Sequence, residues 1–328
     1  MGQMARQAMN SARVDVDLGA VPGLPDTGLR IAADIFWPAS LRMAPAVLFC
    51  FPGGGVQRRY FDMRPGGDDG FSFARALTAQ GHVVVTIDHL GVGESSRPAD
   101  GFALTADVLA AANAVAVASI SGLLRAGKAA PGLTALQDFT PIGVGHSMGA
   151  MLVTLQQIAS PACAGLALLC FATRGLPQYM ADDERENLTR PNMGRDAYPA
   201  LAATRFGGDP YPPVARGRAG SAASDAVAEV QAGVLATAAF QSMMPGSIAP
   251  EAAALRTRLF LAAGDRDMTG PPHEIPASFP GCTDVRLVVI ENSGHHPFVS
   301  PNRDVLFHRL GAWAAELRDE TGAASWRN

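Results

Sequence analysis

Cysteine is scarce in this chain of 328 residues. The four cysteines, Cys50, Cys163, Cys170 and Cys282, are widely spaced, and three of them stand in apolar runs where a free thiol behaves as a small hydrophobic side chain. Their spacing fits neither a disulfide framework nor a zinc site, and no other cluster of possible ligands has metal-binding spacing. We therefore expect neither a metal nor a cofactor.

The chain also lacks a surplus of positive charge and a long apolar run. Its formal net charge is -4, so it carries no basic field of the kind that nucleic acid or anionic lipid requires. No apolar stretch reaches the roughly 18 residues of a membrane span, and the first residues, MGQMARQAMN, contain no signal-peptide core. We expect a cytoplasmic protein that binds neither nucleic acid nor membrane. The pattern leaves the oligomeric state open.

Apolar residues are abundant, and short apolar runs of strand length alternate along the chain with longer segments of helical periodicity. With 48% hydrophobic and 17% charged residues, the chain can bury a large core. Short apolar runs predict strands at 29–36, 46–51, 83–88, 140–145, 165–171, 258–263 and 285–290. Longer periodic segments predict helices at 72–80, 105–126, 148–159 and 303–318. This alternation predicts an α/β fold with a mostly parallel sheet covered by helices on both faces.

Two segments do not fit this alternation. Residues 14–29 are compatible with an edge strand or with a loop. Residues 172–255 hold no convincing strand, and we interpret them as an insertion into a core formed by residues 1–171 and 256–328. Within the insertion we predict helices at 179–188 and 222–244, and a loop at 206–220 because it is rich in Gly and Pro.

A serine flanked by glycines stands between a predicted strand and a predicted helix, in the sequence Gly145-His146-Ser147-Met148-Gly149. A nucleophile on a tight strand-to-helix turn is held in strained backbone geometry, and side chains two residues away on either side would collide. The turn would present the Ser147 hydroxyl at a helix start, where backbone N–H groups favour developing negative charge. The alternative is an inert serine in a glycine-rich turn.

Together with other segments, this motif resembles the α/β-hydrolase superfamily. The segment FPGGG at 51–55 follows a predicted strand and is similar to the family's early turn, and residues 88–96 are similar to its next crossover. The resemblance extends from about Ile31 to Arg318. It implies the α/β-hydrolase fold, a Ser147 nucleophile, and a largely helical cap or lid at residues 172–255.

The resemblance also implies an oxyanion hole. Two backbone N–H groups form it in this family, one from the early turn and one from the residue after the nucleophile. These correspond to Gly54 and Met148. Because Pro52 stands where many members have histidine, Gly53 or Gly55 could supply the first donor instead. A flexible glycine turn without this role is the other interpretation.

The acid and the base of a catalytic triad should follow Ser147 in that order. The predicted strand at 258–263 leads into GDRD, where the family's spacing selects Asp267 over Asp265. The strand at 285–290 leads into a Gly-His-His turn, where the family's pattern selects His295 over His296. We interpret the other histidines as surface or packing residues: His82, His89, His146, His273 and His308.

These residues predict a serine hydrolase that cleaves a carboxylic ester or a related acyl substrate, such as a lactone or thioester, through an acyl-enzyme. The partner is then a small-molecule acyl substrate. Apolar residues of the insertion could line its pocket: Tyr179, Met180, Phe206, Phe240, Met243 and Met244. These side chains could equally hold the cap together.

Two other functions remain open. Another acyl-transfer activity or a carbon-carbon bond hydrolase can keep the same triad, and product analysis would separate these from an esterase. A non-catalytic ligand-binding homologue could also retain the fold. Labelling of the serine without turnover of any ester would favour that reading.

Overall fold

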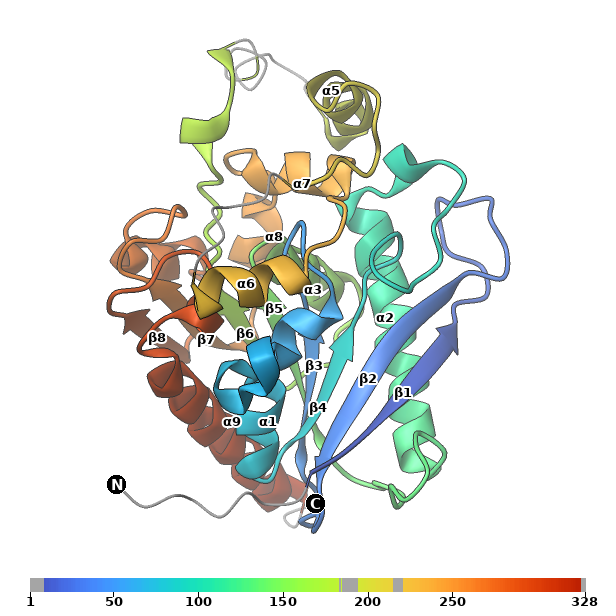
Figure 1. The fold of residues 1–328 in the computed structure, drawn as a ribbon, viewed down its shortest axis with the longest axis vertical. Coiled ribbons are helices and arrows are strands. Elements are labelled where there is room, and N and C mark those ends of the chain that lie inside the picture. The colour runs from blue at the N-terminus through green and yellow to red at the C-terminus, as the bar shows by residue number, and fades with distance from the viewer. Residues whose placement is uncertain (1–8, 183, 185–193, 215–220, 326–328) are drawn as a thin grey trace.

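The computed structural model describes residues 9–182, 184, 194–214 and 221–325 (Figure 1). A single eight-stranded sheet forms its centre, in the order β1-β2-β4-β3-β5-β6-β7-β8. The first two strands are antiparallel to their neighbours and the other six are parallel. The strands are β1 Met9–Asp17, β2 Arg30–Pro38, β3 Ala46–Phe51, β4 Val83–Ile87, β5 Thr140–His146, β6 Gly165–Leu169, β7 Arg258–Gly264 and β8 Val285–Ile290. This architecture confirms the predicted fold class.

Helices cover both faces of the sheet (Figure 1). They include α1 Phe73–Ala79, α2 Ala106–Arg125, α3 Met148–Ala159 and α9 Arg303–Ser325. Strand β3 shows why both faces are apolar, because Val47, Phe49 and Phe51 pack with α2 and α3 while Leu48 and Cys50 pack with α1 and α9. This alternation is the two-residue period of a strand buried on both sides.

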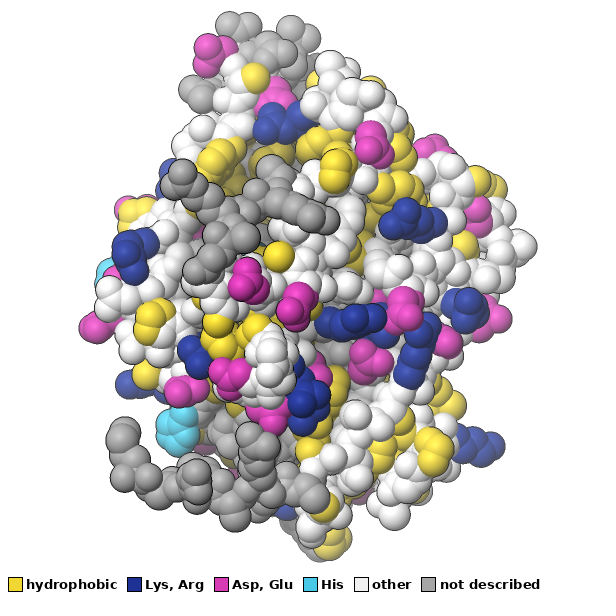
Figure 2. All heavy atoms as spheres, viewed as in Figure 1, with side chains coloured by type: hydrophobic (Ala, Val, Ile, Leu, Met, Phe, Trp, Pro, Cys, Tyr) yellow, Lys and Arg dark blue, Asp and Glu magenta, His cyan; other side chains and the backbone are white. Residues whose placement is uncertain are grey.

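Among the described helices, α2 alone has the length and apolar composition to cross a membrane, and half of that stretch is buried inside the protein. On the face in Figure 2, basic and acidic side chains are interspersed and no large field of one sign is present.

The seven predicted strands and four predicted helices all occur, with ends displaced by a few residues. The open segment at the N-terminus forms part of β1, which pairs with β2 at the edge of the sheet. Its side chains are mostly exposed, so the burial pattern that identifies an inner strand is weak here.

The described part of the segment between β6 and β7 combines helices with loops and contains none of the strands of the sheet. It contains α5 Tyr198–Arg205, α6 Ala222–Glu229, α7 Ala236–Met243 and α8 Ala249–Ala254. The prediction of one continuous helix over 222–244 was wrong. The chain leaves helical geometry after Glu229 because Gln231 forms a β-bridge with Val56, and Ala232 donates its N–H to the carbonyl of Gly55 at 2.9 Å.

Two other predictions for this segment can be compared only in part. Most of the predicted helix at 179–188 lies outside the described residues, as do residues 215–220 of the predicted loop. The part of that loop from 207 to 214 is described, and it contains neither helix nor strand.

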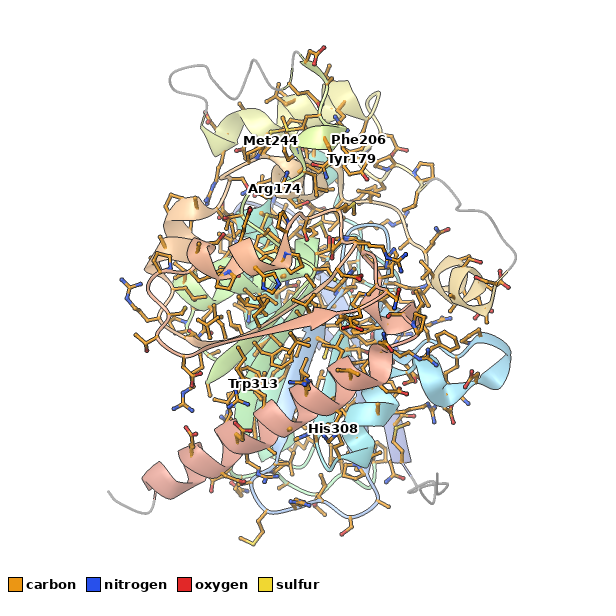
Figure 3. The ribbon with its side chains drawn as sticks, turned by 90° about the vertical axis from the view of Figure 1, so that its left-hand side faces the viewer. Arg174, Tyr179, Phe206, Met244, His308 and Trp313 are labelled. Atoms are coloured by element: carbon orange, nitrogen blue, oxygen red, sulfur yellow. The ribbon has the colours of Figure 1, made fainter. Side chains whose placement is uncertain are left out.

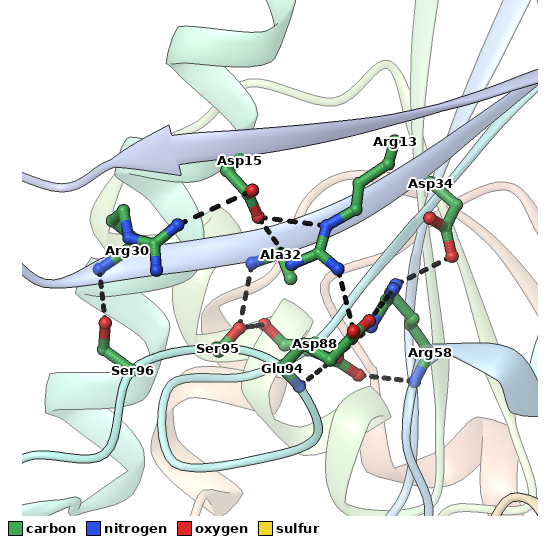
Figure 4. Close-up of polar contacts among 10 residues, drawn as sticks. All are labelled: Arg13, Asp15, Arg30, Ala32, Asp34, Arg58, Asp88, Glu94, Ser95 and Ser96. Atoms are coloured by element: carbon green, nitrogen blue, oxygen red, sulfur yellow. Dashed lines mark hydrogen bonds and ion pairs between the residues drawn. The ribbon is translucent and has the colours of Figure 1, made fainter.

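A buried arginine fixes the chain after the glycine turn at 51–55 (Figure 4). Arg58 is 3% exposed, and its guanidinium donates to Asp34 at 2.7 Å, to Asp88 at 2.5 Å and to Glu94. Asp88, fully buried at the end of β4, also accepts the backbone N–H groups of Arg58 and Glu94. Burial alone would lower the pKa of Arg58, but the surrounding carboxylates outweigh it and raise that pKa. The network therefore joins the residues that follow the glycine turn to β2 and to the end of β4, and the buried guanidinium is fully paired.

We predict that Asp88→Ala destabilises the protein strongly, because it leaves the Arg58 guanidinium buried without its only fully buried carboxylate partner among the described residues. Breaking a buried ion pair by removing one member costs about 3 to 5 kcal/mol. Urea unfolding followed by circular dichroism measures the change. Asp15→Ala is the control, since it removes an ion pair with Arg13 that is about two-fifths exposed and should cost less than about 1 kcal/mol. Equal losses in the two variants would contradict the structural role of the network.

Candidate active site

Ser147 lies on a sharp turn between β5 and α3. Its backbone has φ 53 and ψ -120, a left-handed conformation that costs a residue with a side chain about 1 to 3 kcal/mol. A Cβ on Gly145 would lie 2.5 Å from the backbone of Ala150, and one on Gly149 would lie 2.3 Å from the carbonyl oxygen of Phe51. The two glycines therefore permit the turn and let the end of β3 dock directly against it.

The structure brings Ser147, His295 and Asp267 together in a chain of hydrogen bonds. The His295 Nε2 atom is 2.8 Å from the Ser147 hydroxyl oxygen, and its Nδ1 atom is 2.9 Å from Asp267 Oδ1. Asp267 follows β7 and His295 follows β8, so both extend from the carboxyl ends of neighbouring parallel strands. Such an arrangement can move a proton from the hydroxyl to the imidazole while the carboxylate orients the ring.

The alternative acid and base occupy other positions. Asp265 accepts the backbone N–H groups of Asn292 and Ser293, each at 3.0 Å, and so ties the turn after β7 to the turn after β8. The His296 ring contacts Tyr60, with Nδ1 3.4 Å from the phenolic oxygen. The structure thus places Asp267 and His295, rather than Asp265 and His296, beside Ser147.

The environment of Asp267 favours its ionised form. The side chain is fully buried, which by itself would raise its pKa. Hydrogen bonding to His295 and the imidazole's charge, with smaller contributions from the Cys170 thiol and the Thr269 N–H, outweigh burial and hold the pKa of Asp267 well below its usual range. Asp267 is therefore a carboxylate that can stabilise a positive charge on His295.

Cys170 is a member of the site that the sequence did not identify. It was interpreted as a small hydrophobic residue, yet its thiol lies beside Asp267, and burial raises the pKa of the thiol well above its usual value. Its backbone has φ 53, the same left-handed value as Ser147. The one available signal was its place directly after β6, at the sheet edge that carries the other residues.

The glycine turn at 51–55 lies against Ser147. A Cβ on Gly53 would be 3.1 Å from the Ser147 Cβ, and one on Gly54 would be 3.8 Å from the Met148 sulfur. Within the described residues, the Gly54 N–H has no hydrogen-bond partner. Met148 is the first residue of α3, where N–H groups have no partner within the helix. Neither N–H group is therefore engaged in a hydrogen bond with the described residues.

The apolar residues expected around the pocket lie in the segment between β6 and β7, and several pack against one another. Met180, Phe240 and Met244 are buried in one cluster there, with Phe206 packed against it. Figure 3 shows Tyr179, Phe206 and Met244 grouped above the sheet. Tyr179 is 53% exposed, and Met243 is partly buried and its carbonyl accepts the N–H of Leu176.

These contacts match the packing interpretation for Met180, Phe240 and Met244. Phe206 and Phe240 also border a cavity of about 530 Å³ within the insertion. Nothing in these contacts directs the six side chains toward Ser147.

One group in the described part of the chain has three possible metal ligands close together. His146, Cys170 and His295 each offer an atom, and these atoms lie within 4.8 Å of one another. Both ring nitrogens of His295 are already hydrogen-bonded, to Ser147 and Asp267. An ion bound there would displace the hydrogen bonds of His295 to Ser147 and Asp267, so we assign no metal to the group.

Comparison with known proteins gives one family and many similar folds. The model of the alpha/beta hydrolase family matches residues 47–306. A search of curated proteins found no match. An esterase from Thermogutta terrifontis superposes with a TM-score of 0.57 at 16% identity, covering 94% of this chain and 99% of that one. A peroxisomal alpha-beta-hydrolase from Saccharomyces cerevisiae gives 0.59 at 13% identity, covering 96% and 90%. A monoacylglycerol lipase from Paleococcus ferrophilus gives 0.56 at 18% identity, covering 88% and 99%. At these identities the structures are similar in fold.

We predict that Gly149→Ala destabilises the protein, because its methyl group would overlap the Phe51 and Pro52 carbonyl oxygens. Overpacking of this kind costs about 1 to 3 kcal/mol. Thermal unfolding measures the change. Gly122→Ala is the matched control, since that glycine lies in α2 with nothing within 4 Å of the new methyl group, and alanine there should stabilise the helix by up to about 1 kcal/mol. Stabilisation by both substitutions would contradict the tight contact at Gly149.

A second prediction concerns Asp267 and pH. Its pKa is lower in the folded than in the unfolded chain, so its ionisation contributes stability above the unfolded pKa of about 3.9. That contribution is lost as pH falls through the folded-state pKa. The Asp267→Asn variant has no carboxylate at this position and so never has this contribution. We therefore expect the difference in free energy of unfolding between wild type and variant to become smaller as the pH is lowered from 5. Urea unfolding at successive pH values measures this difference. A difference that stays constant would mean that the pKa of Asp267 does not change on folding.

Proposed function

The chain belongs to the alpha/beta hydrolase family, and on that basis we propose that it is a serine hydrolase acting on a carboxylic ester or a related acyl compound. The observation that carries the proposal is the chain of hydrogen bonds from the Ser147 hydroxyl through His295 to a buried, ionised Asp267. The strained backbone at Ser147 supports it further, because strain of this kind persists where the surrounding structure holds it and clusters at functional sites. A glycine-flanked turn with an inert serine would require neither feature.

In the proposed reaction, the Ser147 hydroxyl attacks the acyl carbon while His295 accepts its proton. Asp267 orients the imidazole and stabilises its charged form. The N–H groups of Met148 and Gly54 donate to the oxyanion that forms, and loss of one such donor typically costs about 2.7 to 4 kcal/mol. His295 then returns the proton to the leaving group. Water, activated by the same imidazole, releases the acyl group from Ser147.

We further propose that residues 172–255 form a cap over this site. Two backbone hydrogen bonds join the segment to the glycine turn, from Ala232 to Gly55 at 2.9 Å and from Gln57 to Val230 at 3.0 Å. A Cβ on Gly54 would lie 3.9 Å from the side chain of Ala239 on α7. Helix α7 therefore lies within van der Waals reach of the proposed oxyanion hole.

The test is hydrolysis of p-nitrophenyl esters from acetyl to dodecanoyl by the wild type and by Ser147→Ala. We expect turnover by the wild type and a loss of about a thousandfold or more in the variant, because no other group can form the acyl-enzyme. Ser160→Ala, an exposed serine at the far end of α3, is the matched control and should retain full activity. The variation of rate with chain length then measures the pocket.

Two outcomes would overturn the proposal in different ways. Equal rates for wild type and Ser147→Ala would remove the serine from the reaction. Covalent labelling of Ser147 by a fluorophosphonate, without turnover of any acyl substrate tested, would favour a ligand-binding protein that retains the fold.

A further inference from the structure

We propose that His146, which directly precedes the nucleophile, is a positioning residue that holds the backbone of the catalytic base against the nucleophile turn. This inference rests on the hydrolase function proposed above. From the sequence His146 was interpreted as a surface or packing residue. The structure gives its ring a specific polar contact inside the site.

The contact joins two strands that are not neighbours. His146 ends β5, and the His295 turn follows β8, with β6 and β7 between them in the sheet. The His146 Nε2 atom lies 2.7 Å from the carbonyl oxygen of His295. Because β5 and β8 do not pair in the sheet, the His146 side chain provides a direct link between the turn that carries Ser147 and the turn that carries His295.

The chemistry of this contact fixes the proton on the ring. A carbonyl oxygen only accepts hydrogen bonds, so Nε2 carries the proton and donates. The Nδ1 atom is buried without a partner among the described residues. In the charged form of the ring Nδ1 would also carry a proton, and that proton would have no acceptor. Burial, together with the charges of His295 and His296, lowers the pKa of His146 well below its usual value. His146 is thus a neutral donor with one defined tautomer.

Packing fixes the orientation of the same ring. His146 is 1% exposed, and its ring centre lies 4.8 Å from that of the fully buried Tyr60 and 5.1 Å from that of His295. On the other side, the Cβ position of Gly53 is only 2.7 Å from His146 Nδ1. The ring thereby contacts the glycine turn, the base turn and an aromatic residue behind the site.

The consequence for catalysis is positional. The His295 imidazole reaches Ser147 at 2.8 Å only if its backbone stays where the His146 donor holds it. A displacement of about 1 Å at a catalytic group can reduce the rate about a hundredfold. Because His146 is 1% exposed, it offers almost no surface to a substrate, and its loss should affect the chemical step much more than substrate binding.

The test compares His146→Phe, which keeps a ring but removes the donor, with His146→Gln, whose amide can donate to the same carbonyl. For His146→Phe we expect kcat to fall about ten- to a hundredfold with KM changed less than twofold. His146→Gln should recover most of that loss. If the Phe variant does not fold, His146→Leu replaces it as the variant without a donor. If kcat falls by the same factor in His146→Gln as in the variant without a donor, the proposal is overturned.

His82→Phe is a matched control. His82 is also 1% exposed, its Nε2 lies 3.0 Å from the carbonyl oxygen of Gly311 on α9, and burial lowers its pKa to about 4. It makes the same kind of bond far from Ser147. We expect His82→Phe and His146→Phe to lower the melting temperature by comparable amounts. We expect kcat to fall in His146→Phe and to stay unchanged in His82→Phe. An equal fall in kcat for both would assign the effect to general destabilisation.

A double substitution tests whether His146 acts through His295. In a His295→Ala background, His146→Phe should cause no further loss in the residual rate of Ser147 labelling by a fluorophosphonate. A further tenfold loss would mean that His146 acts on the serine directly. If labelling does not depend on Ser147 or His295 at all, the proposed function fails. If it depends on both but is unchanged in His146→Phe, only the role of His146 fails.

Discussion

The left-handed backbone of Ser147 is the constraint on which the rest of the site depends. A side-chain-bearing residue adopts φ 53 only where neighbouring structure compensates for the strain. The compensation is visible on both sides of the turn. Upstream, the Ser147 N–H donates to the carbonyl of Leu169 on β6 at 2.8 Å, and downstream its carbonyl accepts the N–H of Ala150 in the first turn of α3. The strain is therefore held by the sheet and by the helix, and the hydroxyl lies 2.8 Å from His295 Nε2.

The same constraint sets the position of the glycine turn at 51–55. Because Gly149 has no side chain, the Phe51 and Pro52 carbonyls lie directly against the start of α3. The buried Arg58 network holds the residues that follow the turn to β2 and to Asp88 after β4. A single close contact between two backbones thus determines both the exposure of the hydroxyl and the place of the proposed oxyanion donors.

The sequence allowed the sheet, its helices and the principal residues of the site to be predicted because each has a local signal. A run such as AVLFCF is apolar on both faces of a strand, and glycines two residues on either side of Ser147 have no other purpose there than close packing. The register of the acid, Asp267 over Asp265, came from the family's spacing, and the structure gives it a physical reason, since Asp265 is occupied by two backbone N–H groups.

What the sequence did not reveal depends on contacts between distant segments. From the sequence, Cys170 and His146 looked like packing residues. Nothing near Cys170 in the chain indicates that Asp267, after β7, lies beside it. Nothing near His146 indicates that the carbonyl of His295, after β8, accepts its N–H. The break between α6 and α7 was missed for the same reason: the alanine-rich sequence favours a helix, but its backbone N–H at Ala232 is drawn to Gly55. That bond joins the segment between β6 and β7 to the glycine turn that lies against Ser147.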